Sequence, residues 1–208
     1  TFFVRGKDGS DPQKALNAGE YTATALVIIA SAILSNTFFG NFNAFIAIIA
    51  GLVVGTIIGK VTEMYKSEKY KSVQQISESS QTGSATNIIS GLSVGMKSCM
   101  YPLIVLGITT YASYAVSGMF GIAMAAVGML SFVSATVSVD TYGPISDNAG
   151  GIAEMSELEP EVREITDKLD SVGNTTAAIG KGFAIGSASL AALSLMVSFL
   201  YAVQPEGS

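Results

Sequence analysis

Residues 21–59 read YTATALVIIASAILSNTFFGNFNAFIAIIAGLVVGTIIG, and none of these 39 side chains carries a charge. A helix needs about 20 mostly apolar residues to cross the hydrocarbon core of a bilayer. The stretch is therefore long enough for two crossings, with GNFN at 40–43 as the turn between them. Because lipid offers no partner to unpaired backbone groups, helices are the structures expected there. We interpret the stretch as a hairpin of two membrane-spanning helices.

Two further uncharged stretches follow, at 98–139 and 182–205, with 42 and 24 residues. The first is long enough for two crossings around a turn near 116–118, and the second for one. The alternating ten-residue segments of a membrane barrel do not occur in the sequence. The sequence thus predicts an all-α membrane protein, a bundle of five transmembrane helices within a single transmembrane domain over 1–208. The spans are expected at about 21–39, 44–66, 85–115, 119–148 and 173–203, with loops at about 67–84 and 149–172.

The basic residues orient this bundle, because Lys and Arg accumulate on the cytoplasmic side of membrane proteins. Nine of the 11 basic residues fall in segments that the five-span topology places on one side. These are Arg5, Lys7, Lys14, Lys60, Lys66, Lys69, Lys71, Arg163 and Lys168. We expect that side, with both long loops, to be cytoplasmic. Residues 1–19 are polar and do not resemble a signal peptide, so we expect the chain to be a piece of a larger membrane protein.

Glycines at helix-packing spacing occur three times, as Gly51 with Gly55, Gly91 with Gly95, and Gly182 with Gly186. A GxxxG pair lets two helix backbones approach closely in lipid. We expect all three pairs to mark tight contacts within the bundle.

Composition excludes several kinds of site. The 208 residues include no histidine and one cysteine, Cys99. A Ser-His-Asp triad, a His-ligated metal and a Cys-based metal cage within the chain are therefore excluded. The net charge is −5, so a nucleic-acid partner is not expected. The segment from Gly173 to Lys181 is not a P-loop, because six residues separate its glycines and Gly182 follows the lysine.

Polar side chains gather where the fourth and fifth predicted spans reach the cytoplasm. Asp140 and Asp147 are seven residues apart, which predicts one face of a continuous helix. Asn174 and Lys181 have the same spacing at the start of the next span. Carboxylate and amide oxygens suit Mg²⁺ that is shared with phosphates, and an ammonium suits phosphate itself. Spacing alone leaves open an interfacial aspartate pair without function and a snorkelling lysine.

Two long motifs carry a resemblance. DTYGPISDNAGGIAEM at 140–155 and GNTTAAIGKGFAIGS at 173–187 closely resemble the signature segments of membrane-integral inorganic pyrophosphatases. GKVTEMYKS at 59–67 and SATNIISGL at 84–92 resemble the preceding family segment. The resemblance covers essentially the whole chain. It implies the central part, about the eighth to twelfth helix, of a homodimeric pump with sixteen helices.

The family resemblance also implies an activity. Its members hydrolyse Mg-pyrophosphate on the cytoplasmic side and move protons, sodium ions or both across the bilayer. They are multi-pass proteins of the prokaryotic plasma membrane or of acidic organelles and vacuoles. The resemblance therefore implies an ion-translocating pyrophosphatase with Mg²⁺ as cofactor.

Residue by residue, Asp147 and Asn174 match the family's positions at the Mg-pyrophosphate site. Asp140 matches an acidic position further into the membrane, and Lys181 is carried over as a further substrate contact. Ala177 matches the position that separates the family's potassium classes, with Gly180 one turn on. Alanine there implies stimulation by K⁺. The carboxylates that activate the attacking water have no counterpart in this chain, so we expect the chain alone to be inactive.

Two other functions are consistent with the residues alone. A fragment of a secondary transporter or channel would bind an ion through Asp140 and small residues, without hydrolysis. A purely structural bundle would lose only stability on Asp147→Ala. Sequence on either side of the chain separates them, because a pump needs further Asp- and Lys-rich motifs at cytoplasmic helix ends.

Overall fold

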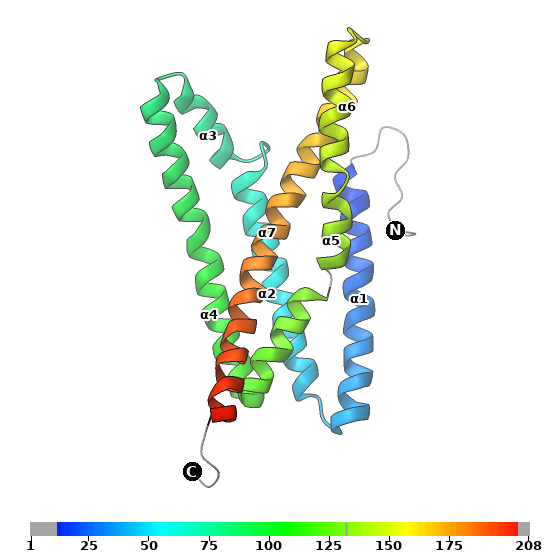
Figure 1. The fold of residues 1–208 in the computed structure, drawn as a ribbon, viewed down its shortest axis with the longest axis vertical. Coiled ribbons are helices and arrows are strands. Elements are labelled where there is room, and N and C mark those ends of the chain that lie inside the picture. The colour runs from blue at the N-terminus through cyan, green and yellow to red at the C-terminus, as the bar shows by residue number, and fades with distance from the viewer. Residues whose placement is uncertain (1–11, 132, 204–208) are drawn as a thin grey trace.

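The computed structural model describes residues 12–131 and 133–203, and these are helical apart from short turns (Figure 1). No strand occurs in the described ranges, which confirms the predicted all-α class. The helices are α1 (Pro12–Phe39), α2 (Asn43–Lys66), α3 (Lys71–Ser80), α4 (Ser84–Leu130), α5 (Val133–Asp140), α6 (Gly143–Met155) and α7 (Pro160–Val203).

Four of these helices, α1, α2, α4 and α7, are long and apolar enough to cross a membrane by length and composition. Large apolar side chains stand exposed along them, including Phe38 of α1 and Met96 of α4, each with about three-quarters of its surface accessible. Such surfaces suit lipid or further helices rather than water. The chain is a multi-pass membrane protein.

Two tight reversals organise the bundle. Between α1 and α2, Gly40 has a φ of +64°, and the Ser35 hydroxyl donates to the Asn41 carbonyl at 2.7 Å. The second reversal lies inside α4, where Ser117 leaves the helical region and Gly118 has a φ of +58°. Glycine is the residue that adopts this left-handed backbone without strain. As a result α4 has a first arm, 84–116, and a second arm, 119–130, which runs back along the bundle (Figure 1).

Helix α2 forms the centre of the core, between α4 and α7. The main cluster of buried apolar side chains comes from these three helices and consists of Leu52, Val54, Ile58, Ile122, Ala125, Ala126, Met129, Phe183 and Leu190. A Cβ added to Gly51 would overlap the Ala125 carbonyl, and one added to Gly186 would overlap the Met129 side chain. Close packing is therefore confirmed at Gly51 and Gly186. It does not occur at Gly91 and Gly95, which have no neighbour within 4 Å in the described part of the chain.

The fourth crossing is a broken helix. It consists of the second arm of α4, then α5, which ends at Asp140, then α6, which begins at Gly143. The prediction that Asp140 and Asp147 share one face of a continuous helix is therefore wrong. Pro144 supplies the physical reason, because its ring would clash with the carbonyl of Asp140 four residues earlier and it has no N–H to donate.

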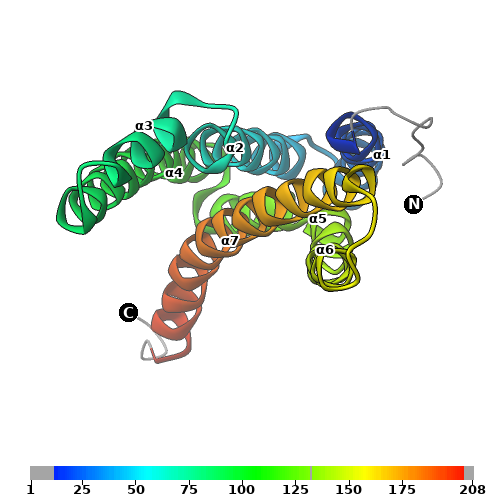
Figure 2. The same ribbon diagram turned by 90° about the horizontal axis from the view of Figure 1, so that it is seen from above.

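Beyond the break, α6 and α7 form a helical hairpin at the end of the molecule where α3 also lies (Figure 1). Helix α7 begins at Pro160, so residues expected in the loop 149–172 are largely helical. Seen from above, α7 crosses the bundle over α5, while α3 and the start of α4 project on the far side (Figure 2). The hairpin carries most of the residues predicted to form the site.

Candidate functional site

The α6–α7 hairpin is held by close backbone contact. A Cβ built on Gly173 would lie 2.7 Å from the Cα of Gly143, closer than real Cβ atoms come to backbone. Seven residues further along α6, a Cβ on Gly150 would lie 3.3 Å from the hydroxyl oxygen of Thr166, which is seven residues earlier in α7. The two helices therefore run antiparallel in a fixed register, with glycines where they come closest.

The same register continues into α5. Thr136 lies seven residues before Gly143, and its methyl carbon would be 3.7 Å from a Cβ on Gly180, seven residues after Gly173. Helix α7 thus pairs with α5 and α6 in succession, across the break between them. In this register Asp140 is level with Thr176 of α7, next to Ala177.

The aspartate and asparagine predicted to bind Mg-pyrophosphate lie on facing helices of this hairpin. Asp147 is four residues beyond Gly143, which places it level with Leu169 in the register. Asn174 is five residues further along α7, an axial offset of about 7.5 Å. Both side chains are exposed. They flank one end of the hairpin at different heights and do not lie opposite each other.

The other predicted residues are spread along α5 and α7. Asp140 is exposed at the end of α5, and Lys181 is exposed on α7. Ala177 and Gly180 are half-buried on α7, one turn apart. The break in the fourth crossing thus brings Asp140 level with Ala177, while Lys181 lies about one turn further from the hairpin.

Sequence reasoning missed one direct partner. Asn174 donates from Nδ2 to Oδ2 of Asp170 at 2.9 Å. The two residues are four apart on one helix, a spacing at which side chains meet and which could have revealed the pair. Because the bond uses Nδ2, the amide oxygen Oδ1 is the atom of Asn174 that could ligate a cation.

A concavity of about 560 Å³ lies beside this pair, between the end of α2 and α7. Two basic and three acidic side chains contribute to its wall, which suits a charged ligand together with counter-ions. Of the residues predicted from the sequence, Asn174 lines it. The full lining is Lys66, Glu68, Arg163, Asp167, Asp170, Ser171, Asn174, Thr175 and Ala178.

Arg163 ties the hairpin together above this concavity. Its guanidinium donates to the Gly150 carbonyl at 2.8 Å and to the Glu154 carboxylate at 2.6 Å, both on α6. It also donates to Asp167 of its own helix at 2.7 Å. These are charge-assisted bonds, the stronger kind. Arg163 is therefore engaged in holding α6 against α7.

The donor chemistry suits a shared Mg²⁺ site, of which the described residues supply a part. Among them, no group of three or more Asp, Glu, His or Cys side chains is placed to hold a metal ion by itself. Asp147 offers a carboxylate and Asn174 an amide oxygen. Mg²⁺ commonly takes one or two carboxylates, keeps several waters and completes its shell with substrate phosphates. These two residues fit that pattern as contributors from one wall of a larger site.

Known proteins match nearly the whole chain. The profile of the family described as inorganic H⁺ pyrophosphatase matches residues 1–207. A putative K⁺-stimulated pyrophosphate-energized sodium pump of Clostridium tetani is 60% identical over 98% of the chain. A K⁺-stimulated pyrophosphate-energized sodium pump of Thermotoga maritima is 48% identical over 96% of the chain. A K⁺-insensitive pyrophosphate-energized proton pump of Methanosarcina mazei is 42% identical over 99% of it. The chain covers 32%, 29% and 32% of these relatives, about a third of their length.

Proposed function

Because the chain belongs to the inorganic H⁺ pyrophosphatase family, we propose that it serves a membrane pyrophosphatase that couples hydrolysis of Mg-pyrophosphate to ion transport. The observation that carries the proposal is the 60% identity, over 98% of the chain, to a relative named as a pyrophosphate-energized pump. The motifs at 140–155 and 173–187 lie within that matched region. A secondary transporter without hydrolysis is not favoured, since the relatives' names state that pyrophosphate energizes them.

On this proposal, the α6–α7 hairpin forms one wall of the substrate site. The Asp147 carboxylate and Oδ1 of Asn174 bind the Mg-pyrophosphate complex, and Asp170 orients Asn174 through its 2.9 Å hydrogen bond. Bound Mg²⁺ would neutralise the charge of pyrophosphate and polarise its phosphoryl oxygens. Lys181 supplies a further positive charge toward phosphate. The groups that activate water come from parts of the protein beyond this chain.

The broken fourth crossing is the element through which hydrolysis could act on transport. Discontinuous helices mark ion sites in many transporters, because the ends of half-helices expose polar backbone groups. Asp140 ends α5, so its carboxylate stands beside the last carbonyls of that helix, and both favour a cation. Release of negatively charged product near α6 would change the local field and bias this break between two positions.

Potassium stimulation follows from the α7 positions next to the break. The register puts Ala177 next to the level of Asp140, and the family resemblance implies that a K⁺ ion takes the place there that a lysine ammonium takes in K⁺-independent members. The relative at 48% identity is named as a K⁺-stimulated sodium pump, and the one at 60% identity as a putative one. We therefore favour a K⁺-stimulated pump that transports sodium, with or without protons. A homodimer in a prokaryotic plasma membrane completes the proposal.

Reconstitution of the full-length protein into sealed liposomes tests it. Adding Mg-pyrophosphate and K⁺ outside should drive uptake of radioactive sodium in vesicles whose active sites face outward. A protonophore should leave primary sodium uptake intact, whereas it would abolish uptake driven by a proton gradient. Pyrophosphate hydrolysis with neither sodium nor proton movement would contradict the coupling. Ion movement without pyrophosphate would favour the transporter.

A further inference from the structure

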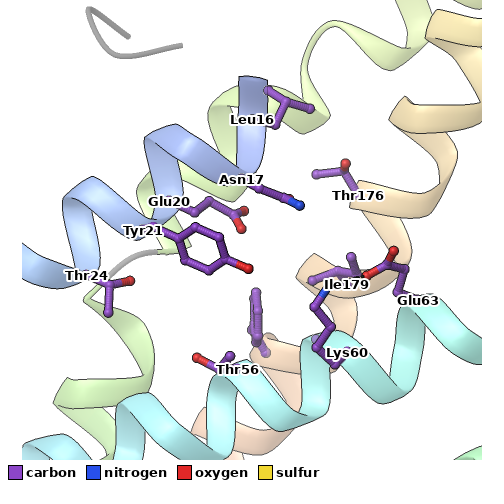
Figure 3. A pocket seen from close by; sticks show the side chains of 12 residues that line it. Leu16, Asn17, Glu20, Tyr21, Thr24, Thr56, Lys60, Glu63, Thr176 and Ile179 are labelled. Atoms are coloured by element: carbon purple, nitrogen blue, oxygen red, sulfur yellow. Dashed lines mark hydrogen bonds and ion pairs between the residues drawn. The ribbon is translucent and has the colours of Figure 1, made fainter. Parts of the chain in front are cut away.

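A second cavity lies between α1, α2 and α7. Its volume is about 190 Å³ (Figure 3). Glu20 of α1 lines it, and this residue is half-buried, with its carboxylate turned toward the other helices. Charged groups that face the interior of a membrane bundle are costly, and they mark functional positions. Glu20 has no role in the proposed binding of Mg-pyrophosphate.

The partner of Glu20 comes from a distant part of the chain. The hydroxyl of Thr136, on α5, donates to Oε1 of Glu20 at 3.2 Å, across 116 residues of sequence. Thr136 is completely buried. The basic residue of the same cavity, Lys60, is paired with Glu63 of its own helix at 2.8 Å. Glu20 therefore connects α1 to α5 and is not neutralised by a direct ion pair with Lys60.

Besides its bond to Glu20, Thr136 also lies against α7, close to the proposed site. Its methyl carbon would lie 3.7 Å from a Cβ placed on Gly180, the position paired with Ala177 in the potassium class. Asp140 follows Thr136 by one helical turn on α5. One side chain thus contacts the α1 carboxylate, packs against the Gly180 position and shares a short helix with Asp140.

Helix α5 depends on such lateral contacts. It has eight residues, and it is separated from the second arm of α4 and from α6 by breaks in the helix. A short helix of this kind is not held in place by continuity with its neighbours. Its depth and rotation follow from what it packs against, which is chiefly α7 and α1.

We propose that Glu20 is a positioning residue of the potassium-stimulated site. Through Thr136 it fixes α5 against Gly180, and therefore the level of Asp140 along α7, next to Ala177. This inference rests on the proposed function and adds to it a residue of α1 that controls the position of α5. The carboxylate acts as a hydrogen-bond acceptor, so glutamine should replace it and alanine should not.

The test uses the full-length protein and four single variants, Glu20→Ala, Glu20→Gln, Thr136→Val and Thr136→Ser, with the double variant Glu20→Ala/Thr136→Val. The measurements are the K⁺ concentration for half-maximal activation and the KM for Mg-pyrophosphate, beside thermal inactivation. Thr56→Val is the matched control. Thr56 lines the same cavity, but its hydroxyl is satisfied by the Leu52 carbonyl of its own helix at 2.9 Å.

We expect Glu20→Ala and Thr136→Val each to raise the K⁺ concentration for half-activation about fivefold or more, a typical size for coupling between sites. The double variant should be no worse than either single one, because both remove the same interaction. Glu20→Gln, Thr136→Ser and Thr56→Val should stay near wild type. If Glu20→Ala does not fold, the inference is tested by comparing the K⁺ concentration for half-activation in Thr136→Val with that in Thr136→Ser.

Several results would overturn the inference. These are unchanged half-activation in Glu20→Ala and Thr136→Val, a double variant with the product of the single effects, or Thr136→Ser as impaired as Thr136→Val. Failure of the folded wild type to hydrolyse pyrophosphate would instead contradict the proposed function. If the wild type hydrolyses pyrophosphate without K⁺ stimulation, the KM for Mg-pyrophosphate replaces half-activation as the measured quantity. Glu20→Ala and Thr136→Val should then raise this KM, while Glu20→Gln, Thr136→Ser and Thr56→Val should not. An unchanged KM in Glu20→Ala and Thr136→Val would overturn the inference.

Discussion

Gly143 and Gly173 meet backbone to backbone, so closely that a Cβ on Gly173 would lie 2.7 Å from the Cα of Gly143. This contact is where the broken fourth crossing joins α7. It sets the register that puts Asp147 level with Leu169 and Asp140 level with Thr176. The geometry of the proposed site therefore depends on two residues that carry no chemistry of their own.

Gly173→Ala should disturb the site by pushing α6 from α7. Overpacking of this kind costs roughly 1–3 kcal/mol, so we expect a lower temperature of half-inactivation and reduced pyrophosphate hydrolysis. Gly151→Ala is the control, because a Cβ there meets nothing within 4 Å and alanine favours helix. Equal behaviour of the two variants would show that the glycine contact is dispensable.

Asp170→Ala should weaken Mg²⁺ use by releasing Asn174. Loss of an orienting partner typically costs about 10–100-fold in metal affinity or activity. We expect a higher Mg²⁺ concentration for half-maximal hydrolysis, with Asp170→Asn closer to wild type because its amide oxygen can still accept the bond. Glu164→Ala is a control on the same helix, since it removes an exposed ion pair with Lys168. An unchanged Mg²⁺ titration in Asp170→Ala would contradict the role given to this residue.

Ala177→Lys should remove the dependence on potassium. Its ammonium would lie near the level of Asp140 and take the place of the K⁺ ion that the proposal puts there. We expect hydrolysis without K⁺ to rise and further stimulation by K⁺ to disappear. Ala177→Met adds similar length without charge and should lower activity while leaving any stimulation dependent on K⁺. Persisting K⁺ stimulation in Ala177→Lys would refute the assignment of this position.

The 208-residue chain by itself should not turn over pyrophosphate. Its described residues place no group of three or more Asp, Glu, His or Cys side chains where they could hold a metal ion, and hydrolysis of pyrophosphate requires metal and water to be held at once. Purified chain in detergent or lipid should give phosphate release no faster than buffer with Mg²⁺. Measurable turnover that disappears in Asp147→Ala would contradict this expectation.

The helical class could be predicted because the uncharged stretches are long and the reversals carry clear turn residues. Gly118 adopts the left-handed backbone that a reversal within α4 requires, and a turn near 116–118 is readable from the sequence. At 141–142 the helix is broken, whereas the sequence predicts a continuous helix there, with at most a kink at Pro144. Seven-residue spacing suggests one helix face only if the helix is continuous, and proline removes that condition.

The site was less accessible to sequence reasoning. Asp147 and Asn174 come from motifs, and their role stays a prediction. The bond from Asn174 to Asp170 could have been read from its spacing of four. The bond from Thr136 to Glu20 could not, because 116 residues separate the two and neither lies in a recognised motif. Contacts between distant helices depend on packing that no local pattern specifies.

The most direct measurement is Mg²⁺-dependent pyrophosphate hydrolysis by membranes that contain the full-length protein, with and without K⁺, beside Asp147→Ala. We predict hydrolysis that rises strongly with K⁺ and falls in the variant by at least the roughly 10–100-fold typical of losing a group that only orients a metal ligand. Hydrolysis that is the same with and without K⁺ would be consistent with the proposed pump but would refute the role given to Ala177. No hydrolysis by well-expressed, folded protein, or full activity in Asp147→Ala, would contradict the account.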